Sequence, residues 1–298
     1  MDEVIKIEGL TKHYGSFSAL EKLNLTVQKG QVLGYLGPNG AGKTTTIRLL
    51  LGLISPTSGK ASICGLDVTK NKVKVHENLA YVPGESSLWP NLTGEETLHL
   101  LAKVHGHVDE KYRRHLIQRF KFDQNKKVRA YSKGNRQKIA LIAALASRSP
   151  VLLLDEPTTG LDPLMEKVFR DCIAEARANG QTIFLSSHIL EEVEALCDQV
   201  AVLREGKLIE TGTLEELRHL AAVTVEATFA HTVPSLTKLK NVRNVKVAGK
   251  HLSCQVYGSI DEVLKIVAAA KPLTFFSREP SLEELFLSLY GETTRKTA

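Results

Sequence analysis

One stretch decides the fold of this 298-residue chain: Gly37-Pro38-Asn39-Gly40-Ala41-Gly42-Lys43-Thr44. It matches the phosphate-binding pattern G-x-x-x-x-G-K-[ST] and stands between an apolar run, Val32–Leu36, and a segment of helical character, 44–53. The glycines let the backbone turn its N–H groups toward phosphate oxygens, and the N-terminus of the following helix adds a partial positive charge. We therefore expect Lys43 to reach the outer phosphates of a nucleotide and the Thr44 hydroxyl to ligate Mg²⁺.

A pair of adjacent carboxylates forms the second signal. The apolar run Val151–Leu154 reads as a buried strand and ends in Asp155 and Glu156. Asp155 can hold Mg²⁺, and Glu156 can orient and deprotonate an attacking water. Acids also end strands as turn or cap residues, so this pair indicates hydrolysis only together with the phosphate loop.

Strands alternate with helices around these motifs, which predicts an α/β fold with a mostly parallel sheet. Helical patterning from about 93 to 144 interrupts the alternation and predicts an inserted helical subdomain. Expected strands are 4–10, 19–27, 32–36, 61–64, 79–82, 151–154, 182–185, 200–203 and 207–211, and further expected helices are 109–120, 164–178 and 189–197.

The pattern changes after about Ala221, which predicts two domains, 1–221 and 222–298. The second is expected to be a small α+β unit that lacks a catalytic constellation and serves packing or dimer stability. Its expected strands are 223–229, 242–247, 252–257 and 273–276, and its expected helices are 261–270 and 281–290.

Composition limits the possible partners. The net charge is +6, but Lys and Arg are spread along the chain, and the densest run, 121–129, is typical of a solvated surface. We therefore expect no nucleic-acid partner. The four cysteines form no C-x-x-C pair, which is typical of reduced structural thiols and indicates no zinc site. No apolar run approaches the roughly 20 residues of a membrane helix, and the acidic start is not a signal peptide. The expected location is therefore inside the cell.

A third motif, residues 131–135, resembles the signature of a known protein family. The stretch Tyr131-Ser132-Lys133-Gly134-Asn135 resembles the signature L-S-G-G-Q of ABC ATPases, and it precedes Asp155 by the family's usual spacing. Gly160-Leu161-Asp162-Pro163 resembles the family's D-loop, and Ser186-Ser187-His188 its switch histidine. Tyr14-Gly15 resembles the aromatic residue that stacks on adenine. The resemblance covers roughly residues 4–220, with five motifs in order.

This resemblance implies a P-loop NTPase of ABC type in which two subunits pair head to tail, each ATP lying between one phosphate loop and the other subunit's signature. Ser132 and Gly134 would then contact the γ-phosphate in trans, although Ser132 is also a natural helix N-cap. His188 would hold the γ-phosphate and the water, and Asp162 would belong to the D-loop. Taken alone, His188 and Tyr14 are more often structural. The implied nucleotide-binding residues are Tyr14, Gly37, Pro38, Asn39, Gly40, Ala41, Gly42, Lys43, Thr44 and Thr45.

The resemblance also implies partners and a location. We expect a separate integral membrane subunit, a second ATP-binding subunit that is another copy of this chain, and a peripheral position on the cytoplasmic face of the membrane. The ending Ser281-Leu282-Glu283-Glu284-Leu285-Phe286 resembles the tail of bacterial drug-, peptide- and ion-export ATPases, which favours export. The alternatives are a soluble ABC ATPase acting on nucleic acid or ribosomes, and a regulatory module that never hydrolyses ATP.

The sequence departs from the family pattern at three places. Lys133 replaces a signature glycine, and Asn135 replaces the signature glutamine. The family's Q-loop glutamine is missing, because Pro83 is followed by Gly84 and Glu85; Glu85 is a candidate substitute ligand for Mg²⁺. Near it, Trp89 could fill a groove that receives the membrane partner's coupling helix, or it could be a core residue.

Overall fold

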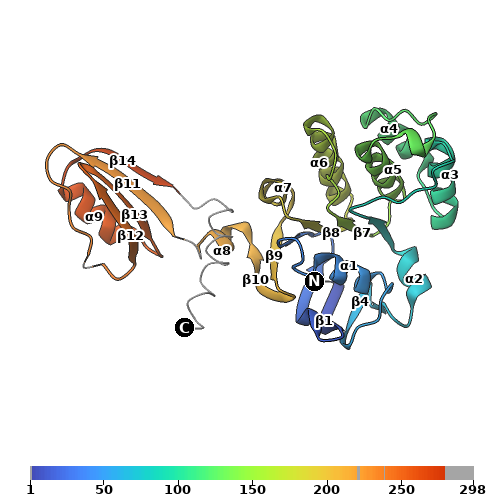
Figure 1. Cartoon of the computed structure of the whole chain (residues 1–298), viewed down its shortest axis with the longest axis horizontal. Coiled ribbons are helices and arrows are strands. Elements are labelled where there is room, and N and C mark those ends of the chain that lie inside the picture. Colours follow the sequence, from blue (N-terminus) through green and yellow to red (C-terminus); the bar gives the residue numbers. More distant parts are fainter. Residues whose placement is uncertain (1, 220–221, 238, 279–298) are drawn as a thin grey trace. The chain divides into compact units, whose positions relative to one another are not determined.

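The phosphate-binding stretch joins β3 (Val32–Leu36) to α1 (Lys43–Leu50) in the computed structural model of the protein, which describes residues 2–219, 222–237 and 239–278 (Figure 1). Strand β3 belongs to a six-stranded sheet with the order β10-β9-β3-β8-β7-β6. Its other strands are β6 (Leu79–Val82), β7 (Val151–Asp155), β8 (Thr182–Ser187), β9 (Gln199–Arg204) and β10 (Lys207–Thr213).

The five strands from β9 to β6 run parallel. Strands β3 and β7 are buried along their whole length, which explains why their sequences are almost continuously apolar. The register pairs Leu36 with Ser187 and Asp155 with Ser186. The carboxyl ends of β3, β7 and β8 therefore meet at one edge of the sheet, where α/β proteins place their ligands.

A second, antiparallel sheet has the order β2-β1-β4-β5. Its strands are β1 (Glu3–Tyr14), β2 (Phe17–Gln28), β4 (Ser58–Ile63) and β5 (Leu66–Asp67). Helix α1 contacts β4 of this sheet and β7 of the parallel one. One apolar core joins both sheets and includes Ile5, Ile7, Leu20, Leu33, Tyr35, Ile47, Leu153 and Phe184.

The helices between β6 and β7 form the group drawn in green in Figure 1. Thr93 caps the first of them with a capping box that also uses Glu96, while Asp109 and Ser132 cap the next two. The elements of this segment are α3 (Gly94–His105), α4 (Glu110–Arg119), the 3₁₀ turn η1 (Val128–Ala130) and α5 (Lys133–Ala146). The remaining helices of the parallel-sheet region are α2 (Lys72–Glu77), α6 (Pro163–Ala178) and α7 (Leu190–Leu196).

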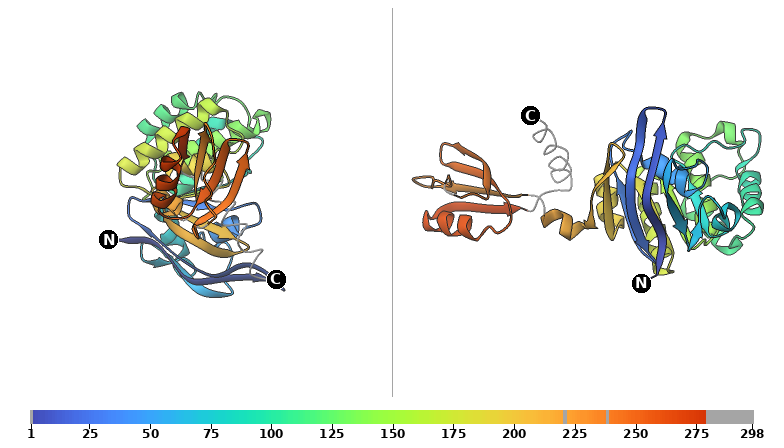
Figure 2. Two further views of the ribbon diagram at one scale, coloured as in Figure 1. Left: turned by 90° about the vertical axis from the view of Figure 1, so that its left-hand side faces the viewer. Right: turned by 90° about the horizontal axis from the view of Figure 1, so that it is seen from below.

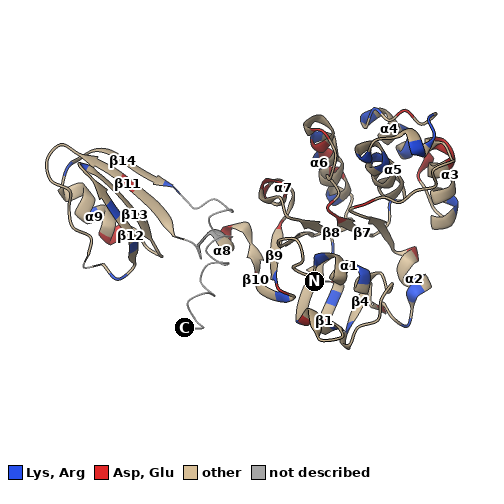
Figure 3. Cartoon of the chain, in the orientation of Figure 1, with Lys and Arg blue, Asp and Glu red and all other residues tan. Residues whose placement is uncertain are grey.

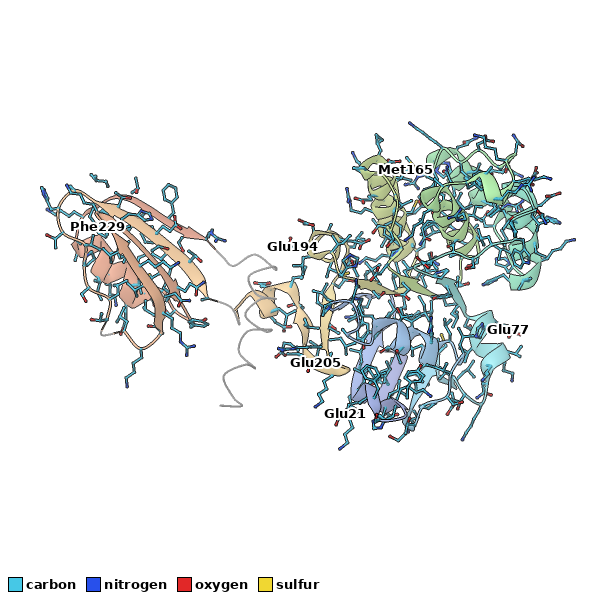
Figure 4. All side chains as sticks on the ribbon, in the orientation of Figure 1. Glu21, Glu77, Met165, Glu194, Glu205 and Phe229 are labelled. Carbon is cyan, nitrogen blue, oxygen red and sulfur yellow. The ribbon has the colours of Figure 1, made fainter. Side chains whose placement is uncertain are left out.

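Contacts divide the chain into two compact units, Met1–Thr211 (the first unit) and Gly212–Ala298 (the second unit). In the second unit, α9 covers one face of an antiparallel sheet with the order β12-β13-β11-β14 (Figure 2). Phe229, labelled in Figure 4, lies in its buried core. Its elements are α8 (Leu214–His219), β11 (Val223–Phe229), β12 (Val242–Ala248), β13 (His251–Val256), α9 (Asp261–Ala269) and β14 (Pro272–Arg278).

The predicted α/β fold is confirmed, with small differences in its elements. Sequence reasoning missed β5, α2 and α8, which are all six residues or shorter. The division between units falls after Thr211, earlier than the predicted boundary after Ala221. The predicted helix 281–290 and the export-type motif 281–286 lie outside the described residues. None of the helices in the described part of the chain combines the length and apolar character needed to cross a bilayer.

Candidate active site

The phosphate loop is packed so closely that two of its glycines cannot be replaced. A Cβ atom on Gly42 would lie 2.7 Å from the carbonyl oxygen of Ala19, and Gly42 has a φ of 110°. A Cβ on Gly37 would lie 2.5 Å from the carbonyl oxygen of Leu203. The loop is also tied down by the hydrogen bond from the N–H of Gly206 to the Ala41 oxygen (2.9 Å). Strands β2 and β9 thus hold the loop in the shape that phosphate binding requires.

Lys43, the first residue of α1, is buried, with 5% of its surface exposed. Its ammonium group donates to the carbonyl oxygens of Gly37 (2.5 Å) and Pro38 (3.2 Å) and lies 3.7 Å from Oε1 of Glu156. Burial lowers the pKa of Lys43, and the Glu156 and Asp155 carboxylates act in the opposite direction. A phosphate group beside this ammonium would favour its charged form further.

Asp155 and Thr44 are the residues whose side-chain oxygen atoms could hold a magnesium ion. Asp155 ends β7, is 4% exposed and accepts a 2.5 Å hydrogen bond from the Ser186 hydroxyl. Thr44 is exposed on the first turn of α1, and Thr45 beside it is half-buried. Mg²⁺ binds through one or two carboxylates together with substrate phosphates, so this donor set fits that ion.

Glu156 stands between two basic side chains. His188 places Nδ1 3.2 Å from Oε1 of Glu156, on the carboxylate that Lys43 also approaches. Glu156 has a φ of 47°, which is unusual for a residue with a side chain, and its N–H donates to the Ser186 carbonyl oxygen (3.0 Å). The structure thus brings together Lys43, Asp155, Glu156 and His188, from three segments of the chain, at the carboxyl edge of the parallel sheet.

The signature and D-loop residues meet at the start of α5. Ser132 is exposed and caps the helix by accepting a hydrogen bond from the N–H of Asn135 (3.3 Å). A Cβ on Gly134 would lie 2.2 Å from the Gly160 carbonyl oxygen, so only glycine allows this contact. Asp162 caps α6 by accepting from the N–H of Met165 (3.0 Å).

Tyr14 lies at the tip of the β1–β2 hairpin, opposite Phe17. Both rings are largely exposed, and the Lys12 ammonium lies 5.1 Å from the centroid of the Tyr14 ring. Because Ala19 of β2 abuts Gly42, this hairpin adjoins the phosphate loop. Tyr14 is therefore available to stack on a planar ring.

Glu85, the candidate substitute for the Q-loop glutamine, pairs with a signature residue. The Glu85 side chain is 87% exposed, and its carboxylate lies 3.6 Å from the Lys133 ammonium. Gly84 instead lies at the end of β7, where a Cβ would be 3.2 Å from the Asp155 carbonyl oxygen. The role of Glu85 as a ligand for Mg²⁺ stays a prediction. Glu85 and Lys133 both depart from the family pattern, and their side chains form an ion pair with each other.

An apolar groove of about 760 Å³ lies beside this loop. Its lining includes Leu53, Val73, Tyr81, Leu88, Leu98 and Val104. Leu53, Val73 and Val104 are each more than 60% exposed, which is unusual for large apolar side chains. Trp89, in the segment that follows Leu88, is 46% exposed, so the interpretation of Trp89 as a core residue is wrong. Lys and Arg residues, blue in Figure 3, occur along helices α4 and α5.

Sequence reasoning missed two buried polar residues near the site, Gln137 and Glu192. Gln137 is 1% exposed and Glu192 is 7% exposed. The Ser187 hydroxyl, next to His188, donates to Oε2 of Glu192 (2.6 Å). Both residues have polar neighbours in the sequence, so the sequence pattern does not indicate that their side chains are buried.

Comparisons with known proteins agree with this geometry. The family described as ABC transporter matches residues 20–159. The chain is 41% identical over 224 residues to the bacitracin transport ATP-binding protein of Bacillus licheniformis, covering 73% of this chain and 72% of that protein. It is 32% identical over 305 residues to the Nod factor export ATP-binding protein I of Ralstonia nicotianae, covering 98% of this chain and 95% of that protein.

Solved structures give the same result. A structure of the ATP-binding subunit of an ABC transporter aligns with a TM-score of 0.68 and 32% identity, covering 72% of this chain and 92% of that chain. A dimeric ATP-binding cassette bound to ADP and Pi aligns with a TM-score of 0.64, covering 70% of this chain and 98% of that chain. Its identity of 23% supports the fold alone.

Proposed function

The chain belongs to the family of ABC transporter ATP-binding proteins, and from this we propose that it hydrolyses ATP to power export through a separate membrane-spanning partner. The observation that carries the proposal is the cluster at the carboxyl edge of the parallel sheet. There the buried Lys43 ammonium and the His188 ring flank the carboxylate of Glu156, one residue after Asp155.

Each group of the cluster has a role in phosphoryl transfer to water. Lys43 and the N–H groups of the phosphate loop bind and neutralise the outer phosphates. Water attacks the γ-phosphorus, the bond to the bridging oxygen breaks, and Glu156 accepts the proton of the water. His188 orients that carboxylate and the water. Bound Mg²⁺ would supply charge neutralisation at the phosphates, and the Thr44 hydroxyl and the Asp155 carboxylate are the groups that would hold it.

A second copy of the chain completes each ATP site in this proposal. Ser132 is exposed at the N-terminus of the 14-residue helix α5, where a hydroxyl and free backbone N–H groups suit a phosphate that approaches from outside the chain. Gly134 and Asp162 lie beside it and would share the interface, and Tyr14 would stack on adenine. Head-to-tail pairing of two chains then brings Ser132 and Gly134 of one copy to the γ-phosphate held by Lys43 of the other.

The apolar groove beside Tyr81 and Leu88 is the surface that we assign to the membrane partner. Exposed apolar side chains at Leu53, Val73 and Val104 would be covered by an apolar helix face of that partner. Such docking would hold the chain at the cytoplasmic face of the membrane. The name of the Nod factor export relative supports the export direction.

Purified protein tests the proposal through its nucleotide chemistry and its oligomeric state. We expect Mg²⁺-dependent phosphate release from ATP, and a fall of roughly 10²–10⁴-fold in the Glu156→Gln variant with ATP still bound. Because the uncleaved nucleotide keeps the pair closed, Glu156→Gln should form a dimer with ATP but not with ADP in size-exclusion chromatography with light scattering. Rapid hydrolysis by Glu156→Gln would remove Glu156 from the mechanism, and a monomer at saturating ATP would argue against pairing of identical chains.

A further inference from the structure

Gln137 is a buried side chain that joins three separate segments. Its Nε2 donates to the carbonyl oxygens of Pro83 (3.0 Å) and Pro157 (3.3 Å), and its Oε1 accepts from the Ser86 hydroxyl (3.0 Å). With 1% of its surface exposed, Gln137 reaches both backbone acceptors and the hydroxyl inside the protein. A buried amide satisfied in this way fixes the distances between the segments that it joins.

The three segments carry different parts of the proposed machinery. Gln137 itself belongs to α5, whose first residues follow Ser132. Pro83 and Ser86 line the apolar groove assigned to the membrane partner. Pro157 follows Glu156 directly. A hydrogen bond to the Pro157 carbonyl oxygen therefore restrains the backbone next to the proposed base.

The backbone at Glu156 needs such support. Its φ of 47° is a conformation that residues with side chains rarely adopt, and such strain persists only where surrounding contacts over-determine it. The N–H of Glu156 donates to the Ser186 carbonyl oxygen on β8, and the carbonyl oxygen of Pro157, one residue further along, accepts from Gln137. Gly84, at the position of the family's Q-loop glutamine, lies against the Asp155 backbone but has no side chain with which to form a hydrogen bond.

We propose that Gln137 is a positioning residue for hydrolysis: it holds Glu156 in its working conformation and links it to the groove segment Pro83–Ser86. This inference rests on the proposed function, because it assumes that Glu156 is the base. In this chain, movement of the groove segment or of α5 reaches the base through the Gln137 amide rather than through a Q-loop glutamine.

The test is Gln137→Met, which keeps a similar volume and removes all three hydrogen bonds. We expect kcat for ATP to fall by roughly 10- to 100-fold, because small displacements of a reacting group have effects of this size, while KM for ATP stays within about two-fold. Gln181→Met is the matched control. Gln181 is also buried, at 6% exposed, and donates to the Ser149 carbonyl oxygen (2.7 Å), so its loss should lower Tm similarly without changing kcat.

A second measurement separates positioning from general damage to the fold. If Gln137 acts through Glu156, adding Gln137→Met to Glu156→Gln should slow the remaining hydrolysis by less than about two-fold, whereas independent effects would multiply. Ser86→Ala removes only the hydrogen bond to Oε1 and should lower kcat by about three-fold. This milder variant tests the same link if Gln137→Met fails to fold.

Three results would each overturn the inference. The first is an unchanged kcat in folded Gln137→Met, and the second is an equal loss of kcat in Gln137→Met and Gln181→Met. The third is a double variant with Glu156→Gln whose loss of kcat equals the product of the two single losses. Failure of the proposed function is distinguishable, because it would appear as absent hydrolysis in the unchanged protein. The unchanged protein would then have no kcat with which the Gln137 variants could be compared.

Discussion

The two units of the chain bury different kinds of side chain. In the first unit, buried polar or charged residues include Lys43, Gln137, Asp155 and Glu192. In the second unit, the buried side chains are all apolar or cysteine among the residues of 212–217, 222–237 and 239–278. Buried polar groups cost free energy unless they are paired, so their concentration in one unit marks where the chemistry lies.

Strand direction explains why the units differ in this way. The parallel strands β3, β7 and β8 all end at one edge, so the residues that follow them converge there. In the second unit the antiparallel strands β11, β13 and β14 end alternately at opposite edges. That sheet builds an apolar core with α9, and in the part of this unit that the structure describes it gathers no comparable set of polar groups.

The largest expected effect comes from Lys43→Ala. Removing the buried ammonium leaves developing phosphate charge without its cation, so we expect hydrolysis to fall by about 10³-fold and ATP binding to weaken. Phosphate release and nucleotide titration measure the two effects. Lys60→Ala is the control, because the Lys60 side chain is 67% exposed and forms an ion pair with the partly exposed Glu8. Unchanged turnover in Lys43→Ala would contradict the assignment of the phosphate loop.

The next effect concerns pairing of two chains. In the Glu156→Gln background, Ser132→Arg should abolish the ATP-dependent dimer, because a bulky cation would block the γ-phosphate held by the other copy. Ser235→Arg places the same change on an exposed serine of the second unit and should leave the dimer intact. Light scattering after chromatography distinguishes the species. A dimer that survives Ser132→Arg would show that the signature does not act in trans.

A third prediction compares the two cores directly. Phe184→Ala and Phe229→Ala each remove a fully buried ring, which typically costs about 3–5 kcal/mol of unfolding free energy. Phe184 contacts Tyr35, with ring centroids 4.9 Å apart, and the Tyr35 hydroxyl lies 3.0 Å from the Thr46 hydroxyl on α1. We therefore expect Phe184→Ala to lower ATPase activity as well.

Phe229→Ala should destabilise the second unit while leaving ATPase activity within about two-fold, because the catalytic side chains all belong to the first unit. Calorimetry and phosphate release on the same samples check both variants. Loss of activity in Phe229→Ala would mean that the second unit supports catalysis, which would break the comparison between the units.

The sequence predicted those parts of the site whose chemistry is contained in a short stretch. The phosphate loop, Asp155 and Glu156 follow apolar strands, and the sheet register then brings them together. Gln137 could not be predicted, because its partners Pro83 and Pro157 come from segments distant in the chain. The ion pair between Glu85 and Lys133 could not be predicted either, because it joins residues far apart in the sequence, and the role of Glu85 toward Mg²⁺ stays a prediction.

The shortest elements and the boundary between the two units also could not be predicted from the sequence. Strand β5 has two residues and α2 and α8 have six each, so none spans a full period of hydrophobic pattern. The boundary between the units depends on which contacts each residue makes, and the predicted position followed the change of pattern near Ala221 instead.

The smallest expected effect is a pH dependence of stability that comes from Glu192. This buried carboxyl group accepts a hydrogen bond from Ser187, the neighbour of His188 in the sequence. Burial raises the pKa of Glu192, while hydrogen bonds from Ser187 and Thr158 oppose this shift. Within the described residues, Oε1 of Glu192 is buried without a hydrogen-bond partner, which favours the protonated form.

A group whose pKa is higher in the folded than in the unfolded protein stabilises the fold fully below its unfolded pKa, about 4.3 for Glu. That stabilisation is lost as the pH rises through the folded pKa. Glu192→Gln has no such loss, so its Tm relative to the unchanged protein should increase from pH 5 to pH 8, by about 2–4 °C. If the amide itself lowers the Tm by the same amount at every pH, that amount cancels when the Tm differences at pH 5 and pH 8 are compared. Glu191→Gln, at an exposed position on the same helix, should show no such trend in thermal unfolding. A Tm difference for Glu192→Gln that stays constant with pH would mean that Glu192 does not titrate in this range.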